Sequence, residues 1–405
     1  MNIFNSLGSN YSKSFVKKAL FTKNNVADVD KLIGFLGQTY DGEVHVTHKG
    51  RDALTLALQA AHIPPQAKVV INGFTCIAVH NAVVKAGCIP VVLDIDPATL
   101  HFEPETLKKV LKKDEAIKAV IVQNTLSYPC NISTLNDVCN QYNCVLIEDG
   151  AHCVGTNYDN GKPVGTVGDL VALSFSQDKI IDGISGGALI IRNKSFQRFS
   201  PGSATTQSQI LELKDRLYPL LTTLIRRTYP YFVGRMLHFF LKIFNVLPKP
   251  VAVGDKNYAL SPFCAQLILH AYERSASNIS HRQHIAQIYH QYIDPSVQSG
   301  FIGKHILTSA NLRFPIFVEN RDKLISHLAA RGVYVGDIWY DAPIAPASNI
   351  QYDIIGTEGE IIEKSASNAQ KIADTIINLP THEHVTSAHA MEISEIINQW
   401  LKQNK

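Results

Sequence analysis

Short apolar runs recur along the first half of the chain, from about residue 44 to residue 193. They are rich in valine and isoleucine and do not alternate with polar residues, which is typical of strands buried on both faces of a sheet. We therefore expect strands at residues 69–71, 89–94, 119–123, 144–148, 171–175 and 188–192.

Segments with helical periodicity lie between these runs, at residues 51–62, 77–86, 103–112 and 134–142. Regular alternation of strands and helices with short links predicts a mostly parallel sheet that helices cover on both faces. Ligands of such α/β sheets bind at the carboxyl ends of the strands. Candidate site residues are therefore expected directly after each predicted strand.

The second half of the chain predicts a smaller α/β unit. Helices are expected at residues 260–273, 280–292, 321–331 and 365–377, and a strand at residues 312–318. A chain of 405 residues is also long for a single core. We therefore divide it into an N-terminal arm (1–30), a large domain (31–255) and a small C-terminal domain (256–405).

Residues 211–250 form a basic, apolar insertion in the large domain, with seven cations and two carboxylates. Such a segment can lie in a membrane interface, and the protein would then be peripheral at the inner face of the membrane. Buried helices are commoner than interfacial ones. Packing against the core or against another subunit is therefore the alternative that we favour.

Composition narrows the class of protein. Hydrophobic residues make up 45% and charged residues 18%, as in folded proteins, and the net charge of +3 is too small to favour nucleic-acid binding. The seven cysteines form no C-x-x-C pair, which predicts free thiols in a reducing compartment and no metal site. No secretory signal or membrane span is recognisable, so a soluble cytoplasmic protein is expected.

Three segments place reactive groups where a ligand would bind. Asp149 follows a predicted strand, although an acid there can simply cap a helix. Lys179 follows another strand within one turn and precedes a glycine-rich bend; burial there would make it a nucleophilic amine, whereas most lysines are solvated. Gly50 and Arg51 open a helix whose positive end suits a phosphate.

In order and spacing, these motifs resemble the DegT/DnrJ/EryC1/StrS family of fold-type-I, pyridoxal-phosphate (PLP) dependent aminotransferases. The resemblance extends from about residue 30 to the C-terminus, and its motifs are jointly specific although each is weak alone. The matching elements are Gly50-Arg51-Asp52-Ala53-Leu54, Phe74-Thr75, Asn81-Ala82-Val83, Asp94-Ile95-Asp96, Glu148-Asp149-Gly150-Ala151-His152, Ser174 to Lys179, Gly186-Gly187, Asn257-Tyr258-Ala259-Leu260 and Asn378-Leu379-Pro380.

The resemblance implies a large domain with a seven-stranded, mostly parallel sheet, and PLP as the cofactor. It implies transfer of an amino group from an amino acid, glutamate being expected, to a nucleotide-linked keto sugar. Lys179 would carry the cofactor and move the proton, and Asp149 would pair with the pyridine nitrogen. His152 would contact the cofactor ring, unless it is an ordinary core histidine.

The remaining implied residues hold the cofactor. Gly50, Arg51, Asp52 (through its backbone N–H) and Ser174 would hold the phosphate, Cys76 stands where the family has a ring-stacking aromatic, and Asn124 would line the site. Asn257 would reach the phosphate bound by a neighbouring subunit, which makes the active unit a homodimer.

Several positions depart from the family pattern and leave the identity of the sugar open. Because Cys76 cannot stack on a ring, either Phe74 compensates or no residue does. Ala259 replaces an arginine near the substrate, and a different segment follows residue 123, so that Asn124 and Tyr128 are expected to line the site in another way.

Two other functions stay open at this point. One is a PLP-dependent lyase or dehydratase, against which Lys179 argues because the sugar dehydratase relatives place histidine there. The other is a membrane-associated, non-catalytic relative, which the basic apolar insertion would suit.

Overall fold

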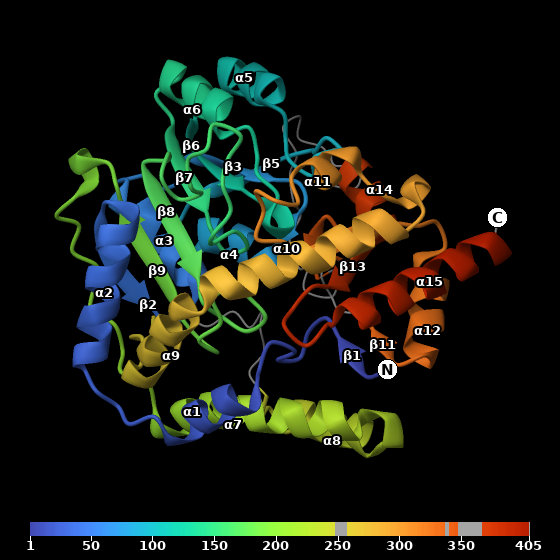
Figure 1. Ribbon diagram of the computed structural model, residues 1–405. Coiled ribbons are helices and arrows are strands. Elements are labelled where there is room, and N and C mark those ends of the chain that lie inside the picture. Colours follow the sequence, from blue (N-terminus) through green and yellow to red (C-terminus); the bar gives the residue numbers. More distant parts are fainter. Residues whose placement is uncertain (248–256, 337–339, 347–366, 405) are drawn as a thin grey trace.

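A seven-stranded sheet forms the centre of the computed structural model, which describes residues 1–247, 257–336, 340–346 and 367–404 (Figure 1). The strand order is β2-β9-β8-β7-β6-β3-β5, and among the described strands of this sheet β9 alone runs against its neighbours. Its members are β2 (Glu43–Thr47), β3 (Lys68–Asn72), β5 (Ile89–Leu93), β6 (Ile117–Gln123), β7 (Val145–Asp149), β8 (Leu170–Ser174) and β9 (Gly187–Ile191).

The predicted fold class and all six predicted strands are confirmed, and the pattern missed only β2 in this sheet. That strand lies at the edge of the sheet, where polar and apolar residues alternate, so it carries no continuous apolar run. The expected boundary at residue 255 lies outside the described residues.

Helices cover both faces of the sheet. Alternate residues of a strand face opposite sides, so Val69 and Ile71 pack with α3 (Gly50–Ala60) and α4 (Ile77–Lys85), whereas Val70 packs with α5 (Pro104–Lys113) and α6 (Ile132–Gln141). At the β8–β9 end, Val171 and Ile190 pack with α2 (Ala27–Tyr40) and α9 (Pro262–Glu273).

The C-terminal part packs beside this sheet and shares a core with it. It contains α10 (Ser275–Tyr292), α11 (Gly300–Lys304), β10 (Arg313–Phe317), α12 (Arg321–Ala330), β11 (Val333–Tyr334), α14 (Ser367–Thr375), β13 (Ile376–Pro380) and α15 (Ser387–Gln403). The prediction of a helix through residue 377 is wrong at its end. Ile376 and Ile377 belong to β13, because they pair with Phe317 and Ile316 of β10.

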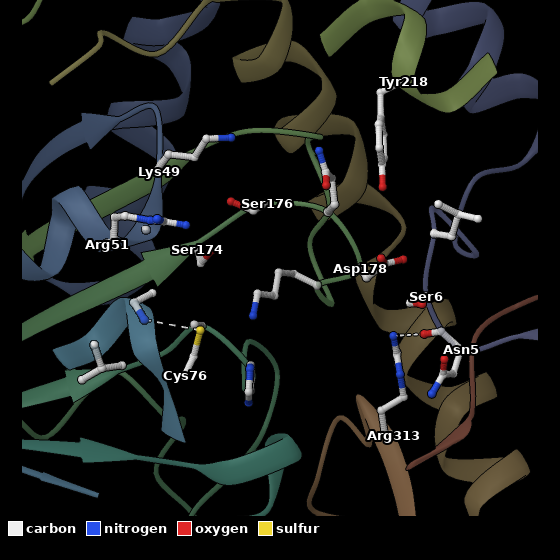
Figure 2. A pocket seen from close by; sticks show the side chains of 18 of the residues that line it. Asn5, Ser6, Lys49, Arg51, Cys76, Ser174, Ser176, Asp178, Tyr218 and Arg313 are labelled. Carbon is white, nitrogen blue, oxygen red and sulfur yellow. Dashed lines mark hydrogen bonds between the residues drawn. The ribbon is translucent and has the colours of Figure 1, made fainter. Parts of the chain in front are cut away.

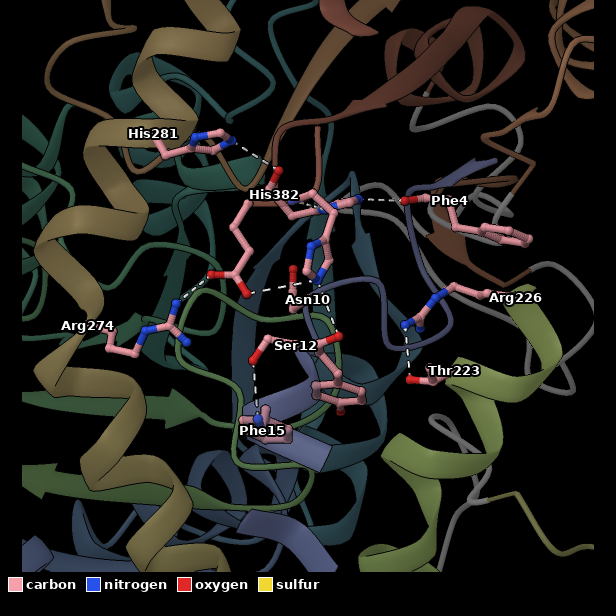
Figure 3. Close-up of polar contacts among 12 residues, drawn as sticks. Phe4, Asn10, Ser12, Phe15, Thr223, Arg226, Arg274, His281 and His382 are labelled. Atoms are coloured by element: carbon pink, nitrogen blue, oxygen red, sulfur yellow. Dashed lines mark hydrogen bonds and ion pairs between the residues drawn. The ribbon is translucent and has the colours of Figure 1, made fainter. Parts of the chain in front are cut away.

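The N-terminal strap, residues 2–12, ties three parts of the molecule together. Its β1 (Ile3–Phe4) pairs in parallel with β11, and His382 Nε2 donates to the Phe4 carbonyl at 2.7 Å (Figure 3). Asn2 Nδ2 donates to the Arg226 carbonyl at 2.7 Å, and Arg282 Nη2 donates to Asn10 Oδ1 at 3.0 Å. Asn10 Nδ2 also donates to the Lys179 carbonyl at 3.3 Å, so the strap links the C-terminal part, the basic insertion and the loop that carries Lys179.

The basic insertion folds into two helices, α7 (Gln209–Thr228) and α8 (Val233–Ile243). With α1 (Lys13–Phe21) they form a separate layer at the lower edge of Figure 1. α7 buries Asp215, Tyr218 and Ile225, whereas α8 fully buries only Gly234. Among the described residues, no helix is long and apolar enough to cross a bilayer.

Glu148 and Asp149, the last two residues of β7, point to opposite faces of the sheet, because successive side chains of a strand alternate. Glu148 is fully buried and accepts a hydrogen bond from the Tyr158 hydroxyl at 2.6 Å. It also accepts three from backbone N–H groups, those of Gly165 (2.7 Å), Val167 (2.8 Å) and Gly168 (2.5 Å). Glu148 thus fixes the loop behind the sheet, and Asp149 is left to face the other side.

Replacing Glu148 with alanine should destabilise the fold, because it leaves the buried N–H groups of Gly165 and Gly168 and the half-buried N–H of Val167 without their acceptor. Each such group costs about 1–3 kcal/mol, so the free energy of unfolding should fall by about 3 kcal/mol or more. Urea denaturation at fixed protein concentration measures this. The matched control is the exposed Glu115→Ala, which should change stability by less than about 0.5 kcal/mol. Equal unfolding midpoints for the two variants would contradict the proposed role.

Candidate active site

A cavity of about 540 Å³ opens at the carboxyl ends of β6, β7 and β8. The last residues of the three strands, Gln123, Asp149 and Ser174, all line it. Figure 2 shows Arg51 and Ser174 on one side of this cavity and Arg313 on the other. The cavity therefore lies where ligands bind in parallel α/β sheets.

A tightly held loop presents Lys179 to the cavity. Asp182 accepts hydrogen bonds from the N–H groups of Asp178 (2.7 Å) and Ile184 (2.8 Å) and from the Tyr11 hydroxyl (3.0 Å). Asp178 and Ile184 both have positive φ, so the loop turns sharply on each side of Asp182. Asn10 of the N-terminal strap donates to the Lys179 carbonyl at 3.3 Å.

Burial makes Lys179 a weak base. It lowers the pKa of the ammonium group from the usual value of 10.5 to about 8, although Cys76 and Asp149 act in the opposite direction. Burial raises the pKa of Asp149, and the N–H of Ala151, which donates to Oδ1 at 3.0 Å, lowers it. The Lys179 ammonium lowers the pKa of Asp149, and the Asp149 carboxylate raises the pKa of Lys179, so each charged group stabilises the other.

His152 is a neutral imidazole in this environment. Burial is the main cause that depresses its pKa well below 6.5, and the positive charges of Lys179 and Arg313 act in the same direction. Nδ1 accepts the backbone N–H of Leu126 at 3.3 Å. The proton of the neutral ring is therefore on Nε2.

The start of α3 supplies an anion-binding end to the cavity. A Cβ on Gly50 would meet Ser174 Cβ at 2.6 Å, so only glycine allows this helix to begin against the end of β8. The positive helix terminus, the guanidinium of Arg51 and the hydroxyl groups of Ser174 and Ser176 face the same cavity. This arrangement suits a phosphate group.

These residues fit PLP. Lys179 would hold the aldehyde end, Asp149 the ring nitrogen, and the α3 start with Ser174 the phosphate. The close approach of Gly50 to Ser174 is the cradle that such a phosphate requires. The structure therefore brings together Lys179, Asp149 and His152 with Gly50, Arg51, Ser174 and Cys76, all of which line the one cavity.

Three predicted cofactor residues do not line this cavity. The side chain of Asp52 pairs with Lys85 at 3.2 Å, and its N–H donates to the Lys49 carbonyl at 3.1 Å. Asn257 is exposed and accepts from the same Lys85 at 2.7 Å. Asn124 is fully buried, donates to the Tyr158 hydroxyl at 3.1 Å and accepts the N–H of Cys130 at 2.9 Å.

Tyr128 and Phe74 also lie outside the lining of this cavity. Tyr128 is buried and donates to Asn311 at 3.0 Å, and it does not line the cavity. Phe74 packs against Tyr340, with ring centroids 4.3 Å apart, and it also lies outside the lining. Cys76 lines the cavity, and Phe74 does not replace the ring-stacking aromatic that is missing at Cys76.

Sequence reasoning missed several lining residues. Gln123 is the last residue of a predicted strand, and Arg313 is a lone cation in an apolar strand, so both carried a recognisable signal. Arg313 donates from Nη1 to the Leu312 carbonyl at 2.8 Å and from Nη2 to the Asn5 carbonyl. No local pattern indicates that the insertion supplies Tyr218, His238 and Lys242 to this cavity.

The lowered pKa of Lys179 predicts unusual reactivity in cofactor-free protein. Only the neutral amine is acylated, so labelling of Lys179 should rise with pH around a midpoint near 8, whereas an ordinary lysine titrates near about 10.4. Asp149→Asn should lower the midpoint, because its carboxylate stabilises the ammonium form. Mass spectrometry measures labelling of each lysine, and the exposed Asp30→Asn is the control. A Lys179 midpoint near that of exposed lysines would refute the assignment.

Two GDP-perosamine synthases are among the curated proteins that match this chain. The GDP-perosamine synthase of Vibrio cholerae is 36% identical over 141 residues, which are 35% of this chain and 38% of that protein. The GDP-perosamine synthase of Escherichia coli O157:H7 is 25% identical over 357 residues, which are 87% of this chain and 84% of that protein. The chain thus spans well under half of the first relative and most of the second.

The comparisons with solved structures and family models agree. The protein Spr1654 of Streptococcus pneumoniae, solved in a PLP form, has a TM-score of 0.69 and 16% sequence identity, covering 97% of both chains. At this identity the likeness establishes the fold. The DegT/DnrJ/EryC1/StrS aminotransferase model matches residues 31–199 and 247–398. The chain therefore belongs to the DegT/DnrJ/EryC1/StrS aminotransferase family.

Proposed function

We propose that this protein is a PLP-dependent aminotransferase that moves an amino group from an amino acid, glutamate being expected, to a nucleotide-linked keto sugar. One observation carries the proposal. Asp149 ends β7, Lys179 follows the adjacent strand β8, and both line one cavity, which ends in the anion-binding start of α3. Family membership and the names of the two curated relatives support the choice of substrate class.

Lys179 is suited to carry the proton of the reaction. PLP, when bound, withdraws electrons from the carbon that bears the amino group, so that this carbon can lose or gain a proton. An amine with a pKa of about 8 exchanges protons readily near neutral pH, because it is populated in both forms. Its Nζ would take the proton from the donor amino acid and later return one to the sugar carbon.

Asp149 and His152 set the charge of the bound ring. The buried carboxylate of Asp149 would keep a proton on the ring nitrogen, because a cation beside it relieves the cost of its own burial. His152 is neutral, with its proton on Nε2, so it can donate a hydrogen bond without adding positive charge.

The cavity lining favours an anionic acceptor. Five cations (Lys49, Arg51, Lys179, Lys242 and Arg313) and two carboxylates (Asp149 and Asp178) contribute to it. Lys179 and Arg51 serve the cofactor in this proposal, and Lys49 donates to Ser185 at 3.0 Å. Arg313 and Lys242 are the cations suited to the phosphates of a nucleotide-linked sugar.

We also infer that the active unit is a homodimer in the cytoplasm. Asn257 is exposed and outside its own cavity, as expected of a residue that would reach the cofactor of a neighbouring subunit. The seven cysteines are all free, which suits a reducing compartment. Sedimentation velocity of the purified protein measures the oligomeric state, and a strictly monomeric active enzyme would contradict the dimer.

The transamination half-reaction tests the proposal directly. Protein loaded with PLP should lose its visible absorption when glutamate is added, and pyridoxamine phosphate should be detected by mass spectrometry. The Lys179→Ala variant should form pyridoxamine phosphate far more slowly than the wild type. The variant Lys118→Ala, at an exposed position, should form it at the wild-type rate. If PLP binds but no amino acid converts it, the alternative of a lyase or dehydratase replaces transamination.

Lys242→Gln should weaken binding of the sugar acceptor alone. Loss of one charged contact to phosphate costs about 1.4 kcal/mol, so KM for the nucleotide-linked sugar should rise by about tenfold. The glutamate half-reaction should keep its rate, because Lys242 has no role in it. The exposed Lys109→Gln is the control. Equal slowing of both half-reactions would place Lys242 elsewhere in the mechanism.

A further inference from the structure

The basic insertion exposes many large apolar side chains. Twelve of the nineteen strongly exposed large apolar side chains in the described part of the chain lie in α7, in α8, in the turn between them and at Phe244, which caps α8. We define the α8 apolar face by its seven outward side chains, Phe232, Val233, Met236, Phe239, Phe240, Ile243 and Phe244. Monomeric soluble proteins rarely expose a patch of this kind without a binding function.

The spacing of these residues makes them a single stripe. They recur every three or four positions from Phe232 to Phe244, so a helix gathers them on one side. Gly234 is buried, and Leu237 and Leu241 pack toward the core of the protein. A Cβ on Gly234 would meet the Ile225 carbonyl at 2.3 Å, so α8 packs closely on α7. The stripe is therefore held outward on a fixed helix.

Positive charge borders the stripe. No aspartate or glutamate occurs from residue 216 to residue 254 of the sequence. Arg227, Arg235 and Lys242 are exposed near the stripe, and Arg235 and Lys242 lie seven positions apart on one edge of α8. The Lys214 ammonium group donates to the Asn245 carbonyl at 2.7 Å, just after the end of α8.

We propose that the α8 apolar face docks this protein on a membrane surface rich in anionic lipids. A short helix with aromatic and aliphatic residues on one side and cations along its edge lies flat in the headgroup region. α8 has 11 residues, far fewer than the roughly 20 that a spanning helix needs. The proposal therefore concerns binding in the plane of the interface.

Charge favours lipid over a second copy of the chain. A two-fold interface would place this positively charged patch of one copy against the same patch of the other, and residues 216–254 hold no carboxylate that could pair with Arg227, Arg235 and Lys242. Like charges oppose such a contact, whereas phosphates of anionic lipids attract all three. The family match stops at residue 199 and resumes at residue 247, so α7 and α8 are features of this chain beyond the family core.

Docking would place the cavity next to the lipid surface. His238 and Lys242 line the cavity, and Lys242 lies on the same edge of α8 as Arg235. The same short helix therefore carries the lipid-binding stripe and part of the cavity wall. This inference does not depend on the proposed reaction, because lipid binding can be measured without substrate or turnover.

Vesicle flotation of the full-length PLP-loaded protein tests the proposal. The wild type should float with vesicles of phosphatidylcholine and phosphatidylglycerol about tenfold more than with phosphatidylcholine alone. The triple variant Phe232→Ser, Phe239→Ser and Phe244→Ser should lose flotation, since these side chains are 63%, 60% and 70% exposed. The double variant Arg227→Glu and Arg235→Glu should lose the preference for anionic vesicles.

Matched controls separate docking from unspecific effects. Leu307→Ser removes an equally exposed apolar side chain elsewhere, and Lys109→Glu with Lys112→Glu reverses two exposed charges on α5. Both should float as the wild type does. Visible absorption of bound PLP shows whether each variant is folded. If the triple variant does not fold, the single variant Phe239→Trp tests docking instead. Its tryptophan fluorescence should shift to the blue when anionic vesicles are added, because docking moves residue 239 from water into lipid.

Two results would overturn the proposal. One is wild-type flotation that is no greater with anionic vesicles than with neutral ones, together with an unchanged Phe239→Trp spectrum. The other is an assembly of the wild type in sedimentation velocity that the triple variant dissociates, because the face would then be an interface between copies of this chain. Loss of transamination with retained flotation would contradict the proposed reaction and leave the docking intact.

Discussion

Burial of an amine and a carboxylate at one edge of the sheet is the constraint on which the site depends. Lys179 and Asp149 both lose most of their water, which lowers the pKa of the first and raises that of the second. Neither shift would arise on an exposed loop. The parallel pairing of β7 with β8 brings the two residues to the same edge, since their strands end side by side.

Supporting groups on both sides of the sheet hold this arrangement. Glu148 binds the loop behind β7, so that the next residue can face the cavity. Asp182 organises the loop that carries Lys179, and burial, with the negative charge of Asp178, raises the pKa of Asp182 to about 7. The N-terminal strap contacts the same loop through Tyr11 and Asn10, so the chain start is part of the site's support.

The basic insertion contributes both to the wall of the cavity and to the exposed α8 apolar face. α7 turns Tyr218 into the cavity (Figure 2). Desolvation lowers the pKa of the partly exposed Lys49 beside the start of α3, and the carboxylate of Asp215 on α7 acts in the opposite direction. α8 adds His238 and Lys242 to the wall while its outer stripe faces away from the protein. The strap bonds to α7 at Arg226, which donates to the Leu7 carbonyl and whose own carbonyl accepts from Asn2, so the insertion is tied to the segment that also contacts the Lys179 loop.

The sequence by itself determined the sheet strands, most helices and the central groups of the site. Val- and Ile-rich runs predict buried strands because both faces need apolar side chains, and Asp149, Lys179 and Gly50 lie where such strands and helices end or begin. Only the tertiary structure decided which neighbours reach the cavity. Asn124 follows a strand but bonds to Tyr158, whereas Arg313 and Lys242 arrive from distant segments. Periodicity records which side of an element is apolar, but not which distant residues pack against it.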